Sequence, residues 1–215
     1  MFEKAIRFDI PPTDNTATGY SCGEVALGAA VSYLLPDKER PMRENLEELT
    51  CKLPNHNTWP EELVRAVGLY PELKATIHRT HPITVPLTLY IRHHYGENNE
   101  HLIEETNLEH VEKAILECET ARLYQIGAFD LEFLLKHVRT DQVVICWFDI
   151  NVLYEYETDT FKPHYNVITG YDLDCVSMHE SGNLHSLPVA HQRVGHERFM
   201  KSLGPTPNFI TVELG

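Results

Sequence analysis

Cys22 is the residue whose surroundings best suit a nucleophile. It stands at the start of a run of small and apolar residues in which Leu27, Val31 and Leu34 recur at helical spacing, so it marks the first turn of a buried helix that Pro36 ends. A helix N-terminus carries the positive end of the dipole and unpaired N–H groups, which favour a thiolate, the form that attacks carbonyls. A lone cysteine at such a place more often serves only as a small buried residue, so a partner is needed.

The two residues after Cys22 have opposite expected effects. Gly23 would let a substrate backbone approach closely, whereas the carboxylate of Glu24 opposes formation of a thiolate nearby. The other four cysteines lie inside expected strands or helices, where burial in the core is the simpler interpretation.

A histidine that could act as the base opens a predicted strand. His164 follows Lys162-Pro163 and begins a β-branched and aromatic run that reaches Asp172, and a histidine at a strand end can face a cleft rather than the core. A second run, Cys175–His179, follows after a tight turn, so the two strands should form a hairpin. A base of this kind needs an orienting partner on its other ring nitrogen.

The pairing of this hairpin indicates Glu180 as that partner. With a three-residue loop at 172–174, Glu180 lies opposite Asn166 and on the same face as the candidate base, at a diagonal spacing of about 7–8 Å that a glutamate can span. A two-residue loop would shift the register by one residue and put His179 on that face instead. Glu180 is therefore the predicted orienting residue, with His179 and Asp172 as alternatives.

The elements that must position these residues divide the chain in two. Residues 1–140 are mainly helical in pattern and residues 141–215 mainly strand, which predicts an α+β fold with helices segregated from an antiparallel sheet. Further helices are expected near Pro41, at a Thr58-Trp59-Pro60-Glu61 capping box with a stop at Gly68, within the acidic stretch 98–125, and from Asp130 to Val138. The remaining expected strands are 142–148 and 209–214.

Composition restricts the class of protein. The 215 residues suit a single domain, and a net charge of −14 would be repelled by nucleic-acid phosphates and by anionic membranes, so neither is an expected partner. The sequence shows neither a long apolar run nor an apolar signal core near its start. Five scattered cysteines without a Cys-x-x-Cys pair predict no disulfide framework, which suits the cytoplasm.

Taken together, these motifs resemble the papain-like cysteine peptidases. The branch they resemble most is that of the bacteriocin-leader (double-glycine) peptidases and their stand-alone relatives. The matching motifs, in chain order, are Gly19-Tyr20-Ser21-Cys22-Gly23, the capped helix at 58–61, the strand at 142–148, His164–Asp172 and the tail Val194–Phe199. The resemblance is weakest over residues 80–128, which look like an insertion.

The resemblance implies a two-lobed α+β fold and attack on an amide carbonyl through an acyl-enzyme. Cys22 matches the nucleophile and His164 the base of a triad whose third member is usually Asp or Asn. Here the matching stretch is Met178-His179-Glu180-Ser181, which departs from that pattern. The oxyanion donor, a Gln upstream of the cysteine in the family, corresponds to Asn15. These departures would also suit an acyl or peptidyl transferase, or an inactive interaction module on the same scaffold.

Two other interpretations have weaker support. Histidine groups could gather a cation, but none has a known ligand spacing, and no glycine-rich phosphate loop is present, so we expect no metal and no cofactor. The candidate groups are His93, His94, His101 and Glu104, and His185, His191 and His196. The eight glutamates from Glu97 to Glu119 could bind a basic protein, although such runs are usually solvated helix faces.

Overall fold

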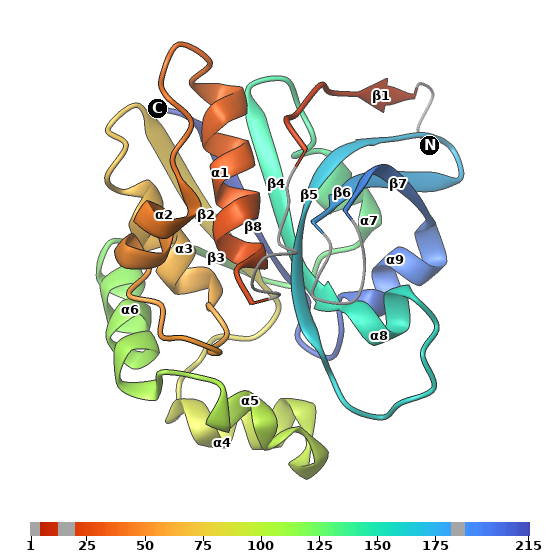
Figure 1. The fold of residues 1–215 in the computed structure, drawn as a ribbon. Helices are drawn as coiled ribbons and strands as arrows, with labels where there is room; N and C mark the ends of the chain where they lie inside the picture. Colours follow the sequence, from red (N-terminus) through yellow and green to blue (C-terminus); the bar gives the residue numbers. More distant parts are fainter. Residues whose placement is uncertain (1–4, 13–19, 182–187) are drawn as a thin grey trace.

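A computed structural model describes residues 5–12, 20–181 and 188–215 of the chain. Within those residues the fold centres on one eight-stranded sheet in the order β3-β2-β8-β4-β5-β6-β7, with β1 paired to β5 (Figure 1). Neighbouring strands run antiparallel except for β2 and β3. The predicted α+β class is therefore confirmed.

The bounds of the elements are as follows. The strands are β1 Ile6–Arg7, β2 Leu73–Arg79, β3 Tyr124–Ile126, β4 Gln142–Asp149, β5 Pro163–Tyr171, β6 Cys175–Glu180, β7 Val189–Gly195 and β8 Asn208–Leu214. The helices are α1 Cys22–Leu34, α2 Arg43–Leu49, α3 Pro60–Val67, α4 Leu87–Tyr95, α5 His101–Glu104, α6 Leu108–Thr120, α7 Leu131–Leu135, α8 Ile150–Leu153 and α9 His196–Ser202, with a 3₁₀ turn η1 at Glu97–Asn99.

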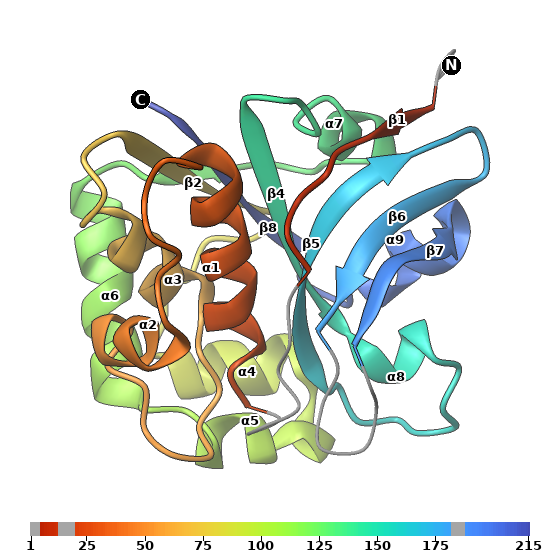
Figure 2. The same ribbon diagram turned by 45° about the horizontal axis from the view of Figure 1, so that its top comes forward.

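Helix α1 packs directly on the sheet. Leu27, Ala29 and Ala30 are completely buried, and small side chains let the helix approach β4 and β5 closely. Figure 2 shows α1 lying against these strands, with β5, β6 and β7 curving away on the other side. The starts of α1 and β5 lie toward the same side of the molecule, the side on which α4 and α5 lie (Figures 1 and 2).

The cap of α3 differs from the predicted one by a residue. The helix begins at Pro60, and the Glu62 carboxylate accepts a hydrogen bond from the Trp59 N–H at 2.7 Å. The Thr58 hydroxyl, predicted to cap the helix, instead donates to Glu24 at 2.6 Å. The predicted stop at Gly68 is confirmed as the C-cap.

Strand β2 is the main element that the sequence analysis does not predict. It lies among the helices of residues 1–140, yet it pairs with β8 along its whole length, from Leu73 opposite Leu214 to Arg79 opposite Asn208. From Leu73 to Ile77, buried apolar residues alternate with more exposed polar ones, which is the local pattern of a strand. The sheet therefore extends beneath the helical part of the molecule.

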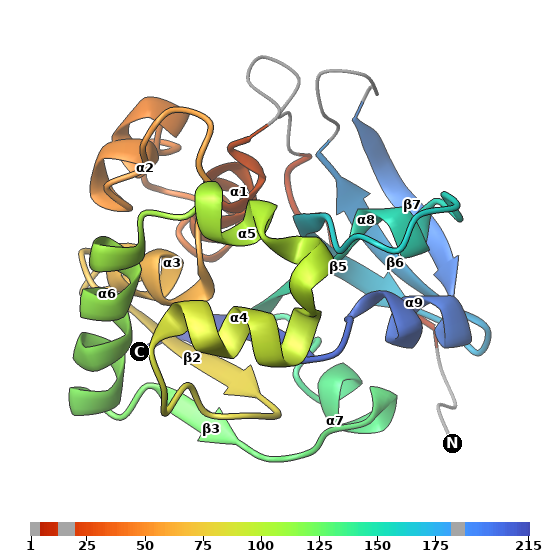
Figure 3. The same cartoon turned by 90° about the horizontal axis from the view of Figure 1, so that it is seen from below.

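The segment predicted as an insertion, residues 80–128, forms α4, η1, α5, α6 and β3. Figure 3 shows α4 and α5 crossing the lower side of the molecule, with α5 near the starts of α1 and β5. The Asn99 side chain accepts from the Phe161 N–H at 2.6 Å, and His101 Nε2 donates to the Phe161 carbonyl at 2.9 Å. The segment thus holds the loop that leads into His164.

No helix in the described part of the chain is both long and apolar enough to span a bilayer.

Candidate active site

Cys22 is the first residue of α1, as the sequence predicts, and its side chain is partly buried. The first hydrogen bond within the helix runs from Val25 N to Ser21 O at 3.0 Å. The N–H groups of the first three helical residues therefore make no intrahelical bond and point toward the end of the helix where the thiol lies.

Gly23 has a different role from the one that the sequence suggests. A Cβ atom at this position would come within 3.2–3.3 Å of Leu63 and Tyr165. The absence of a side chain thus allows α1 to pack against α3 and β5. That close packing sets the position of Cys22 relative to β5.

His164, near the start of β5, lies between Cys22 and Glu180. Its ring is 4% exposed, and Nε2 lies 2.8 Å from Oε1 of Glu180. The thiol of Cys22 is close enough to the same ring to help raise its pKa. Because Nε2 meets the carboxylate, Nδ1 is the ring nitrogen that remains for a second partner.

The charge of His164 follows from these two neighbours. Burial is the largest influence and by itself disfavours the imidazolium, but Glu180 and Cys22 outweigh it and together raise the pKa of His164 to about 10. The ring therefore carries a proton and a positive charge at neutral pH.

Glu180 reaches His164 through the register of the β5–β6 hairpin. Near the turn the pairing differs from the predicted one, because Tyr171 lies opposite Val176 rather than Cys175. An irregularity between Ile168 and Gly170 then shifts the register by one residue, so Val167 lies opposite His179. The predicted relation between Glu180 and Asn166 is restored beyond this point, and the two side chains are 2.9 Å apart.

The two alternative orienting residues lie elsewhere. His179 Nε2 donates to the Ile10 carbonyl at 2.6 Å, and its Nδ1 accepts from the His191 N–H, so neither ring nitrogen is left for His164. Asp172 accepts from the N–H groups of the β5–β6 turn and pairs with Arg193 at 2.5 Å. Asn15, the predicted oxyanion donor, lies outside the described residues.

Glu24 does not face the thiol. It is completely buried and accepts hydrogen bonds from Thr50 at 2.9 Å and Thr58 at 2.6 Å, with the Lys52 ammonium 3.9 Å away. Its carboxylate thus joins α1 to the segment around α2. The repulsion expected between this carboxylate and a Cys22 thiolate is reduced by these donors.

Sequence reasoning placed Asn166 opposite Glu180 without giving it a role, and it missed Tyr154 and Ser181. Asn166 donates to Oε2 of Glu180, and the Tyr154 side chain also interacts with that carboxylate. The Ser181 hydroxyl lies 3.4 Å from His164 Nε2. Tyr154 reaches the site from the end of α8, which no local pattern indicates.

Among the described residues, no group of three or more histidine, cysteine or carboxylate side chains could hold a metal ion. His101 bonds to the Phe161 backbone, and the His94 ring packs against Tyr90, His81 and His93. His185, in the second candidate group, lies outside the described residues.

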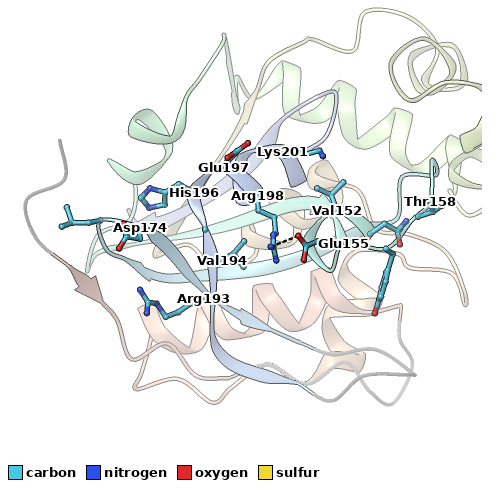
Figure 4. A pocket seen from close by; sticks show the side chains of 14 residues that line it. Val152, Glu155, Thr158, Asp174, Arg193, Val194, His196, Glu197, Arg198 and Lys201 are labelled. Carbon is cyan, nitrogen blue, oxygen red and sulfur yellow. Dashed lines mark ion pairs between the residues drawn. The ribbon is translucent and has the colours of Figure 1, made fainter.

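Two hollows differ in their relation to Cys22. The larger, about 1120 Å³, opens between α8, β7 and α9, and Figure 4 shows the Arg198–Glu155 ion pair (2.7 Å) within it. None of Cys22, His164 and Glu180 lines it. A smaller hollow of about 220 Å³ adjoins α1; its lining residues are Tyr20, Ser21, Glu47, Lys52, Leu53, Pro54 and Asn55. The smaller hollow is lined by Ser21, the residue that precedes Cys22, so it lies beside the start of α1.

Comparison with solved structures relates this fold to one class of protein. A double-glycine motif protease from an AMS/PCAT transporter, solved in complex with the leader peptide, matches over 98% of both chains with a TM-score of 0.52 and 14% identity. A C39-like peptidase from Bacillus anthracis matches over 98% of both chains with a TM-score of 0.51 and 11% identity. The chain therefore has the papain-like α+β fold of the double-glycine peptidases.

The peptidase domain of Streptococcus ComA, a bifunctional ABC transporter, matches over the full length of both chains at 12% identity with a TM-score of 0.45. No protein-family model and no curated protein sequence matches the chain.

Proposed function

We propose that this protein is a cysteine peptidase in which Cys22 is the nucleophile, His164 the general base and acid, and Glu180 the orienting acid. The observation that supports this most directly is the row of three side chains. The thiol is close enough to the imidazole to help raise its pKa, and Nε2 of that ring is 2.8 Å from a buried carboxylate. A shared fold alone would not require these three groups to meet.

The proposed reaction follows from the charges in the row. His164 already holds the proton of Cys22 as an imidazolium, and the thiolate attacks the carbonyl carbon of a peptide bond. The N–H of Cys22 donates to the oxyanion, and the Asn15 amide is the second proposed donor; such a donor contributes about 3–4 kcal/mol. His164 then passes its proton to the leaving amine. Water, deprotonated by the same imidazole, releases the acyl group and regenerates the thiol.

The proposed substrate is an extended peptide that places its scissile bond over Cys22. One protein of the same fold is a double-glycine motif protease that binds a leader peptide, so a pair of glycines before the scissile bond is the first sequence to test here. The hollow beside Ser21 offers room for a larger side chain further along the peptide.

Two measurements test the proposal. Mass spectrometry should find that iodoacetamide labels Cys22 fastest, ahead of the more exposed Cys51. A peptide library with and without Gly-Gly should be cleaved by the wild-type protein and by Cys51→Ala, but not by Cys22→Ala. Faster labelling at Cys51, or cleavage that survives Cys22→Ala, would rule out this mechanism.

A further inference from the structure

Glu180 has other polar partners besides His164, and Asn166 is the one that lies on the same strand as the histidine. Its Oε1 meets His164 Nε2 at 2.8 Å, and its Oε2 accepts from Asn166 Nδ2 at 2.9 Å. Each carboxylate oxygen thus has its own donor. All three side chains are almost completely buried, with exposed fractions of 4% or less.

Asn166 is itself fixed in orientation. It lies two residues after His164 on β5, so both side chains project from the same face toward β6. Its Oδ1 accepts from the Ser181 N–H at 3.4 Å, while Nδ2 faces Glu180 and also lies 3.4 Å from the Met178 sulfur. Because the Ser181 N–H can only donate, the amide atom that it meets is the oxygen Oδ1. The atom that faces Glu180 is therefore the nitrogen Nδ2, which donates.

A glutamate has physical need of such a donor. A buried carboxylate is costly to keep ionised unless it receives hydrogen bonds, and glutamate has one more rotatable bond than aspartate. With His164 as its partner on β5, Glu180 would receive no hydrogen bond from that strand at Oε2. Asn166 supplies it and restricts the rotation that would turn Glu180 away.

We propose that Asn166 is a positioning residue whose side-chain amide keeps Glu180 ionised and turned toward His164. The proposal rests on the proposed function, because it assigns Asn166 a part in stabilising the imidazolium beside Cys22. Asn166 touches neither the thiol nor the peptide and acts through Glu180.

The test is the pH dependence of Cys22 alkylation by iodoacetamide between about pH 4 and pH 9, which needs no substrate. Asn166→Leu keeps the branched shape and the number of side-chain heavy atoms but has no donor, so Glu180 should take up a proton more readily and support the imidazolium less. The midpoint of the rate curve should move upward by about one pH unit, and the rate below that midpoint should fall about tenfold.

Two variants separate this role from a general effect of removing a buried amide. Asn208 is buried in β8, and among the described residues its side-chain amide donates to the Thr206 carbonyl and not to Glu180, so Asn208→Leu should keep the wild-type midpoint. Asn166→Gln keeps the donor and should return the midpoint toward the wild-type value. Circular dichroism checks that each variant is folded, and Asn166→Ala replaces Asn166→Leu if the leucine variant is not.

The outcomes distinguish the two proposals. If Cys22 of the wild-type protein reacts no faster than Cys51 at acidic pH, the proposed peptidase mechanism is wrong. If wild-type Cys22 reacts rapidly but the Asn166 variants share its midpoint, or if Asn208→Leu shifts as far, only the role of Asn166 is overturned. A shift of the alkylation midpoint in Asn166→Leu or Asn166→Ala, but not in Asn166→Gln or Asn208→Leu, supports the role of Asn166.

Discussion

At the scale of single residues, the charge on His164 is the property that links structure to chemistry. Its ring is buried, which alone would favour the neutral form, yet Glu180 and Cys22 hold its pKa at about 10. A protonated imidazole can stabilise a neighbouring thiolate and later donate its proton to the leaving amine. In the proposed mechanism, both steps therefore depend on the carboxylate of Glu180.

Replacing Glu180 by glutamine should remove most of the activity without disturbing the fold. Glu180→Gln keeps the size and one hydrogen bond but removes the negative charge, so kcat/KM for a cleaved peptide should fall about 10²–10⁴-fold. Retained activity would show that the carboxylate is not needed.

The same variant makes a prediction about stability. The folded pKa of His164, about 10, lies above its unfolded value of about 6.5, so the stabilisation is fully present below pH 6.5 and is lost as the pH rises toward 10. Urea unfolding should thus show the wild-type protein losing its advantage over Glu180→Gln across that interval. A difference that stays constant with pH would contradict the assigned protonation.

At the scale of the elements, β1 is attached to the sheet by a close approach that only glycine permits. Gly170 has a φ of +157°, and a Cβ atom there would lie 2.2 Å from the Ile6 carbonyl oxygen. The strand leads toward Ile10, whose carbonyl holds His179. The position of β1 therefore influences the back of the hairpin that carries the candidate site.

Gly170→Ala should separate β1 from β5. The clash is with backbone atoms and cannot be relieved by a rotamer change, so the free energy of unfolding should fall by about 1–3 kcal/mol. Hydrogen exchange should quicken at Phe8, whose N–H bonds to the Thr169 carbonyl. Gly195→Ala is a matched control, because a Cβ atom there meets nothing within 4 Å. Equal effects of the two substitutions would refute this account.

At the scale of the whole molecule, a buried ion pair joins the helices to the sheet. Arg79, at the end of β2, lies 2.7 Å from Glu61 of α3, and both side chains are almost completely buried. Tyr124 of β3 donates to the same carboxylate at 2.9 Å. Burial opposes the charge on Arg79, but Glu61 is among the neighbours that raise its pKa.

Replacing one member of this ion pair should lower the free energy of unfolding more than replacing both members. Arg79→Met leaves Glu61 buried without its counter-ion, and the free energy of unfolding should fall by about 3–5 kcal/mol. Adding Glu61→Leu should recover part of that loss, since no unpaired charge then remains. Chemical unfolding of the two single variants and the double variant measures the coupling. Additive losses would show that the two charges do not stabilise each other.

The sequence by itself determined the local elements and the residues that could do chemistry. Apolar residues at helical spacing after Cys22, and a β-branched run after His164, specify a helix and a strand because side-chain periodicity is a local property. The α+β class and the pairing of Glu180 with Asn166 followed from the same patterns. The observed pairing agrees with the predicted one at Glu180 because the register shifts between Ile168 and Gly170, and no sequence pattern predicts that shift.

Only the tertiary structure decided which of these residues meet. The choice between Glu180, His179 and Asp172 depended on the register of the hairpin, which the irregularity before Gly170 shifts by one residue. The insertion of β2 beside β8 and the approach of α1 to β5 at Gly23 join segments far apart in the chain. Such contacts depend on how whole surfaces pack, and packing is not encoded in the spacing of neighbouring residues.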